Sequence, residues 1–199
     1  MGFPTAHDTD NWPIIKAKWF KDIINQKREV RVIVIHTMES GETNKTAENV
    51  AKYFQGLSST KKASAHLCID NNSIVQCVLD NDVAFAAPGA NHNGIQLELA
   101  GKANQSSAQW DDVYSKDLLE NAANAAAQYC LKYNLPRKHL SDTELKNGDE
   151  GIIGHDQATA VFKISTHTDP GQNFPWATFI ARVDYYYQQR RKSLGLPTP

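Results

Sequence analysis

Two histidines of this 199-residue chain each come directly after a run of apolar residues that is typical of a β-strand. His36 follows Val30–Ile35, and His155 follows Ile152–Gly154. Open α/β sheets bind ligands in the crevice outside the carboxyl ends of their strands, so we expect both side chains at such an edge. Imidazole is the commonest protein ligand of metal ions. The two positions therefore predict a metal site.

The segment Thr166–Gly171 supplies two candidates for a third ligand, His167 and Asp169. A hydrolytic zinc site takes three protein ligands from His, Cys and Asp or Glu, and leaves the fourth position to water. Either residue completes such a set, and spacing alone does not choose between them. Asp, Pro and Gly are also common turn residues, so Asp169-Pro170-Gly171 is equally consistent with a simple turn.

A carboxylate inside an otherwise apolar strand is the next unusual feature. Glu98 and Gln96 alternate with three apolar residues in the strand expected over Gly94–Gly101, so they share its polar face. A buried carboxylate is costly unless it is paired, near a metal or in a wet cleft. If this face lines a cleft, Glu98 is a natural general base for a zinc-bound water. The alternative is a face that is only partly solvated.

The elements that position these residues follow from hydrophobic periodicity and turn signals. Strands interleaved with helices, with one hairpin among them, indicate an α/β fold: a single domain whose central mixed β-sheet is flanked by helices. We expect strands at Val30–Ile35, Leu67–Asp70, Ile74–Leu79, Gly94–Gly101 and Ile152–His155. We expect helices at Thr46–Leu57, from Ser115 as the capping residue to Tyr133, and after Pro175. Between His155 and Asp169 we expect a loop.

Composition excludes several classes of protein. The chain is 41% hydrophobic and 22% charged with a net charge of −1, which is ordinary for a globular domain and gives no reason to expect nucleic acid as a partner. No apolar run approaches the roughly 20 residues that span a bilayer, so we expect no membrane insertion. The three cysteines are sparse and odd in number, which favours buried free thiols over disulfides.

We expect three segments along the chain. Residues 1–27 form an N-terminal extension that packs on the domain and carries a short helix around Ile14–Ile24. Residues 28–188 form the catalytic domain, and residues 189–199 a linker or tail. Such a tail would make the chain one module of a longer protein.

Four motifs in order then resemble a known family. They are VIVIHT ending at Thr37, SAH at Ser64–His66, NHNGIQLELAG at Asn91–Gly101, and IIGHDQ with THTDPGQNFPW between Ile152 and Trp176. Together they resemble the type-2 N-acetylmuramoyl-L-alanine amidases, which share their fold with the peptidoglycan recognition proteins. The THTDPG form looks most like the amidase module of endolysins from phages of actinobacteria. The resemblance covers roughly residues 28 to 184.

The resemblance implies a role for each candidate residue. His36 and His155 match the two zinc histidines, and Asp169 matches the third ligand in members that end with Thr-Asp-Pro-Gly. Glu98 matches the acidic residue of the family's central strand. The resemblance therefore implies a Zn²⁺ cofactor and an amidase/peptidoglycan-recognition-protein-like fold.

The sequence departs from the family in two places. Where many members carry a Lys two residues before the last ligand, this chain has His167, which we predict to stabilise the oxyanion; Lys163 is the alternative. Ala65 stands where some relatives carry an active-site Tyr, so Glu98 has to serve as acid and base alone. His66 and His92 either line the cleft, support a ligand or are structural.

The implied function is zinc-dependent hydrolysis of the amide bond between N-acetylmuramic acid and L-alanine in peptidoglycan, as a phage endolysin module for host-cell lysis. Further wall-binding modules would then belong to the longer chain. The alternatives are a peptidoglycan-binding module without activity and a zinc peptidase that cuts within the stem peptide. Because the N-terminus lacks a basic start and an apolar stretch, we expect a protein made in the host cytoplasm without a signal peptide, which acts on the cell wall as a monomer.

Overall fold

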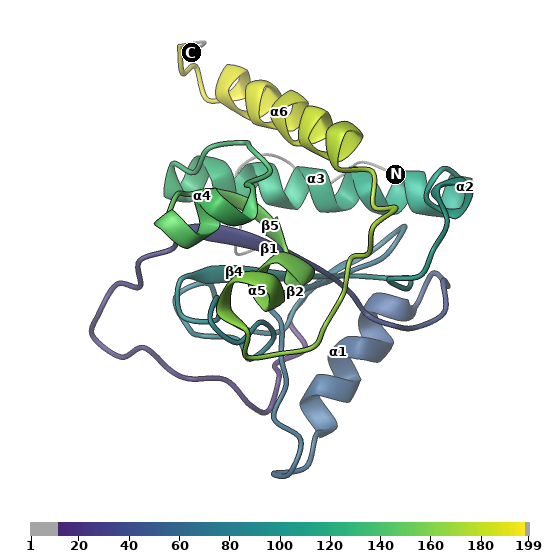
Figure 1. Ribbon diagram of the computed structural model, residues 1–199, viewed down its shortest axis with the longest axis vertical. Helices are drawn as coiled ribbons and strands as arrows, with labels where there is room; N and C mark the ends of the chain where they lie inside the picture. Colours follow the sequence, from purple (N-terminus) through teal and green to yellow (C-terminus); the bar gives the residue numbers. More distant parts are fainter. Residues whose placement is uncertain (1–11, 198–199) are drawn as a thin grey trace.

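A five-stranded mixed sheet forms the centre of the computed structural model, which describes residues 12–197 (Figure 1). The strand order is β3-β2-β4-β1-β5. All neighbouring strands are parallel except the antiparallel hairpin of β2 and β3. The strands are β1 (Val32–Thr37), β2 (Leu67–Ile69), β3 (Ile74–Gln76), β4 (Gly94–Leu99) and β5 (Gly151–Gly154). This confirms the expected α/β fold with a mixed sheet and its hairpin.

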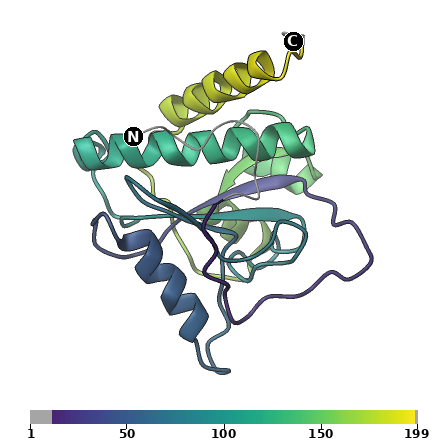
Figure 2. The same cartoon turned by 180° about the vertical axis from the view of Figure 1, so that it is seen from behind.

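Helices cover both faces of the sheet. On one face lies α3 (Val113–Tyr133), and α6 (Trp176–Ser193) packs on the outer side of α3, as both views show (Figures 1 and 2). On the other face, α1 (Thr46–Gly56) contacts β2 and β3, and α5 (His155–Phe162) contacts β1 and β5. Two short helices, α2 (Ser107–Trp110) and α4 (Asp142–Asn147), complete the set in the described part of the chain.

The two faces of the central strands differ in polarity, as the alternation in the sequence predicts. Apolar side chains of β1 and β4, among them Ile35 and Leu97, join α3 and α6 in the largest core cluster. The opposite face of the same strands carries His36, Gln96 and Glu98. Burial of the apolar face therefore presents three polar residues together on the other side.

The start of α3 differs from the expectation in its capping residue. We expected Ser115 to cap this helix, but the helix begins two residues earlier and the Asp112 carboxylate accepts a hydrogen bond from the Ser115 backbone N–H. Asp is as good an N-cap as Ser, and Ser115 is buried within the first turn, where its hydroxyl donates to the Gln109 carbonyl.

The segment after Trp12 is extended, so the helix expected around Ile14–Ile24 is wrong. The Ile15 N–H donates to the Gln76 carbonyl and the Ala17 N–H to the Cys77 carbonyl. The segment thus satisfies its backbone by pairing beside the edge strand β3, which local propensity cannot reveal. The part of the predicted extension at residues 1–11 lies outside the described residues.

The remaining expectations concern the tail, the thiols and the membrane. Helix α6 continues to Ser193, past residue 189 where we expected the tail to begin. All three cysteines are buried and free, as predicted. Among residues 12–197, no helix combines the length and the apolar character that crossing a membrane requires.

Candidate metal centre

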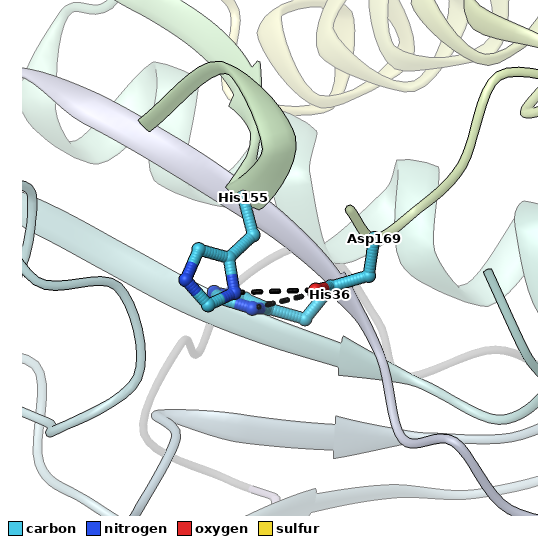
Figure 3. A group of neighbouring side chains, drawn as sticks. All are labelled: His36, His155 and Asp169. Atoms are coloured by element: carbon cyan, nitrogen blue, oxygen red, sulfur yellow. Dashed lines mark hydrogen bonds and ion pairs between the residues drawn. The ribbon is translucent and has the colours of Figure 1, made fainter. Parts of the chain in front are cut away.

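Three elements bring His36, His155 and Asp169 together (Figure 3). His36 is the second-last residue of β1. His155 directly follows β5, which pairs with β1 through Ile35 and Gly154. Asp169 comes from the segment between α5 and α6. All three side chains are buried, and one potential ligand atom from each lies within 4.8 Å of the others.

His155 is the first residue of a helix, whereas we expected it to end a strand that a loop follows. Helix α5 begins at His155 because the Gln157 side chain accepts a hydrogen bond from the Gly154 N–H, and Asp156 places a negative charge in the first turn. The helix fixes the backbone of His155 more rigidly than a loop would. The Asp156 N–H also donates to the Asp169 carbonyl, which ties the third residue to the same helix.

The hydrogen bonds of Gln96 determine the tautomer of His36. The Gln96 amide nitrogen donates to the Ala90 carbonyl at 3.1 Å, so its oxygen accepts from His36 Nε2 at 2.9 Å. His36 Nδ1 then points at Asp169 Oδ2, 3.1 Å away. If His36 is neutral, a lone pair faces a carboxylate, and only a proton or a metal ion between the two atoms makes this contact favourable.

His155 presents a second ring nitrogen without a partner to the same point. Its Nδ1 lies 3.3 Å from Asp169 Oδ1 but is buried without a hydrogen-bond partner. Its Nε2 is 3.4 Å from the Ser165 hydroxyl. A buried ring nitrogen without a partner is costly, and a metal ion would satisfy it.

Burial and the two imidazoles act in opposite directions on Asp169. Burial alone would raise its pKa, but the imidazoles of His155 and His36 beside it hold the pKa of Asp169 well below its usual range. The pKa of His155 is lowered, mainly by burial. For His36, burial lowers the pKa but the Asp169 carboxylate outweighs it, so the pKa of His36 is raised. The centre therefore contains a fixed anion that requires positive charge beside it.

Glu98 lies next to this centre on the neighbouring strand. It pairs in register with His36 across β4 and β1, so both side chains lie on the same face of the sheet. Its Oε2 is buried without a partner. Burial, with smaller contributions from Asp169 and Glu39, raises the pKa of Glu98 to about 7 although His36 lowers it. A carboxyl group with such a pKa can both accept and return a proton near neutral pH.

His167 and Lys163 occupy different environments. The His167 side chain is 61% exposed, its Nδ1 lies 3.3 Å from Asp169 Oδ1, and its ring stacks on that of His155 at 4.3 Å. Lys163 ends α5 with a left-handed backbone, and it is not among the residues that line the cleft. His167 is thus beside the centre but more exposed than the three buried residues, and Asp169, not His167, joins the two histidines in the buried group that could hold a metal.

A cleft of about 740 Å³ opens onto these residues. His36, Glu98, His155, His167 and Asp169 all line it. Much of the remaining lining is apolar or aromatic and comes from α1 and the segments after it. This wall includes Val50, Tyr53, Phe54 and Phe85, and Lys62 also lines the cleft. The site therefore combines a charged end with a broad surface for a larger substrate.

Gln96 is the residue that sequence reasoning missed, although the alternation that singled out Glu98 also placed Gln96 on the same face.

Of the two further histidines considered from the sequence, His66 has a structural role. It is fully buried and accepts from the Gln96 N–H, and its Nε2 lies 3.1 Å from Arg28 Nη2. Burial lowers the pKa of His66 to about 3, so it is a neutral structural residue. His92 does not line the cleft.

The raised pKa of Glu98 predicts a pH dependence of stability in protein kept free of metal. Between its ordinary pKa of 4.5 and about 7, the folded state holds a proton that the unfolded state releases. The stability that Glu98 contributes is therefore complete below pH 4.5 and is lost as the pH rises through 7. In the presence of a chelator, the melting temperature of the parent should fall more between pH 4.5 and about 7 than that of Glu98→Gln.

The exposed Glu29→Gln serves as the control, since its side chain is 79% exposed, and it should follow the parent. Equal pH dependence in Glu98→Gln and the parent would show that Glu98 titrates normally.

Comparison with known proteins identifies a protein family. The family model described as N-acetylmuramoyl-L-alanine amidase matches residues 26–172, which include every residue of the centre. A search of curated proteins finds no match to the sequence.

Solved structures of similar fold include a hydrolase, an AmpD derivative and an endolysin. Staphylococcus aureus hydrolase AmiA in complex with its ligand has a TM-score of 0.59 at 15% identity, over 91% of this chain and 87% of that one. A selenomethionine AmpD derivative has a TM-score of 0.60 at 18% identity, over 92% and 99%. A mutant endolysin from Bacillus subtilis has a TM-score of 0.54 at 16% identity, over 86% and 99%. At these identities the likeness establishes the fold.

Proposed function

Because this chain belongs to the N-acetylmuramoyl-L-alanine amidase family, we propose that it hydrolyses the amide bond between N-acetylmuramic acid and L-alanine in peptidoglycan, with Zn²⁺ held by His36, His155 and Asp169. One observation carries the proposal. Two buried imidazole nitrogens and a buried carboxylate converge within 4.8 Å, and the hydrogen bond from His36 to Gln96 leaves its second nitrogen free to bind a metal.

The residues fit zinc by their chemistry. Zinc in hydrolases is bound by three nitrogen or oxygen ligands from His and carboxylates, with a further position open to substrate and water. His155 Nδ1 has no other partner, and the Asp169 anion supplies the compensating charge. When bound, zinc would act as a Lewis acid that activates water and polarises the scissile carbonyl.

Glu98 moves the proton in this proposal. It takes a proton from the attacking water and returns it to the amine of L-alanine as that amine leaves, so one residue serves in both steps. Its pKa of about 7 suits this exchange, and its unpartnered Oε2 is free for the proton. No second acid is required.

His167 acts on the developing negative charge. Its ring is held against His155 by stacking, and its exposed edge borders the cleft. From there it can donate a hydrogen bond to the oxyanion of the tetrahedral intermediate. Lys163 does not line the cleft, which favours His167 for this role.

The substrate lies along the cleft in this proposal. The reacting amide sits at the charged end, and the aromatic and apolar wall with Tyr53 and Phe54 contacts the sugar and the stem peptide. A solved structure with a similar fold is a Bacillus subtilis endolysin, which supports an additional proposal: that the chain is a lysin module acting on the host wall. A full set of ligand residues favours an enzyme over a binding module.

Muropeptide analysis tests the reaction. Purified peptidoglycan is digested with zinc-loaded protein, and with the same protein in excess chelator, and the products are identified by mass. We expect new stem peptides with a free L-alanine amine and intact glycan strands, only in the loaded sample. Fragments with new amines inside the stem would support a peptidase, and binding without any fragments would support a recognition module.

Substitution of Glu98 separates proton transfer from metal binding. Glu98→Gln should keep one zinc ion per chain, since Glu98 is not a ligand, and should lower kcat by about a hundredfold or more. Zinc content is measured by elemental analysis and kcat on a soluble muramyl peptide. Parent-like turnover in this variant would rule out Glu98 as the proton carrier.

The two candidates for oxyanion stabilisation make a matched pair. His167→Ala should lower kcat by roughly a hundredfold with zinc content unchanged, because a lost oxyanion donor has that order of effect. Lys163→Ala should retain the kcat of the parent, because Lys163 does not line the cleft. The reverse pattern would assign the role to Lys163, and loss of zinc from His167→Ala would make His167 a ligand.

A further inference from the structure

Glu39 has a left-handed backbone conformation that its position in the chain does not explain. Among residues 12–197, four residues other than glycine have a positive φ. Asn134 and Lys163 each end a helix, where the left-handed conformation is common, and Asn25 is a residue type that tolerates it. Glu39, with a φ of 50°, ends no helix and is not an asparagine. Such outliers are maintained by their surroundings and are frequent at functional sites.

The side chain of Glu39 explains why this conformation is maintained. One carboxylate oxygen, Oε1, accepts hydrogen bonds from the Thr37 hydroxyl and from the Ala103 N–H, each at 2.7 Å. Glu39 therefore joins the end of β1 to residues 100–106, which we call the β4–α2 loop. The backbone alongside follows the same course, because the Ser40 N–H donates to the Gly101 carbonyl.

The β4–α2 loop in turn contacts the segment that carries Asp169. A Cβ on Gly171 would lie 1.8 Å from the Ala103 carbonyl oxygen, so the two backbones approach as closely as glycine allows. Two residues further on, the Asn173 amide donates to the Gln105 carbonyl at 2.9 Å. The β4–α2 loop thus lies between Glu39 on one side and the segment 169–173 on the other.

We propose that Glu39 is a positioning residue for Asp169, which acts through Ala103 and the backbone contact of Ala103 with Gly171. The proposal rests on the proposed function in one respect, that Asp169 is a zinc ligand. Without the Glu39 carboxylate the β4–α2 loop loses a hydrogen bond at Ala103, and the segment 169–173 loses the fixed surface that it packs against. Loss of such outer support weakens metal binding by about ten- to a hundredfold.

Two substitutions at Glu39 test the proposal. Glu39→Gly removes the carboxylate and keeps the backbone conformation, because glycine adopts a positive φ without strain, so the variant should fold. Glu39→Gln keeps an oxygen that can accept from both Thr37 and Ala103 but removes the charge. The zinc dissociation constant is measured by competition with a chromogenic chelator, and folding by thermal melting of the metal-free proteins.

We expect the zinc dissociation constant of Glu39→Gly to rise about ten- to a hundredfold and that of Glu39→Gln to stay within a few-fold of the parent. Saturating zinc should restore most of the kcat of Glu39→Gly. Glu29→Ala, at an exposed glutamate remote from the loop, should bind zinc as the parent does. Parent-like affinity in Glu39→Gly would overturn the proposal, and so would an equal loss in Glu39→Gln, since charge and not the hydrogen bonds would then matter.

Asn173→Ala tests the contact between the β4–α2 loop and the segment 169–173 from the other side. If Glu39 and Asn173 both act through the β4–α2 loop, the double variant Glu39→Gly/Asn173→Ala should lose less affinity than the product of the two single losses. Fully multiplicative losses would contradict a shared path. The affinity of the parent for zinc separates the two proposals. If the parent binds no zinc, the proposed function is refuted. If the parent binds zinc and Glu39→Gly binds it equally tightly, only the role of Glu39 is refuted.

Discussion

The position of β1 between β4 and β5 is the constraint on which the site depends. Parallel pairing fixes His36 beside Glu98 on one side, and fixes Ile35 beside Gly154, one residue before His155, on the other. A shift of either strand by one residue would turn its side chains to the opposite face and would separate these groups. The large apolar core under α3 prevents such a shift, because it binds the other face of the same strands. Core packing and site geometry are therefore two consequences of one register.

Charge then determines what the assembled residues can do. Asp169 is an anion in a buried place, and the imidazoles of His36 and His155 stabilise it. Without further positive charge, His36 has to hold a proton to face Asp169, which is why its pKa is raised. A divalent ion would replace that proton and satisfy His155 Nδ1 at the same time. The cost of burying these groups is thus offset most completely when the metal is present.

The sequence contained the periodic information but not the contacts between distant segments. Alternation in β4 identified the face that carries Glu98, and the strand-end positions of His36 and His155 placed them at one edge. The choice between His167 and Asp169 depends on burial, since the two residues are neighbours in one turn and only the packed structure separates an exposed ring from a buried carboxylate. Helix α5 escaped prediction because it is short and begins without a side-chain cap on Gly154.

The helix prediction for the segment after Trp12 failed for a related reason. Its residues have no strong preference, and the hydrogen-bond partners that decide its conformation, Gln76 and Cys77, lie some sixty residues away in the chain. The same holds for Gln96, whose importance comes from the carbonyl of Ala90 on one side and the ring of His36 on the other. Local patterns thus predict which residues face the cleft. Which atom of a residue is free to react follows only from its contacts in the folded chain: the bond to Gln96 turns His36 Nδ1 toward Asp169, and His155 Nδ1 and Glu98 Oε2 are buried without a partner.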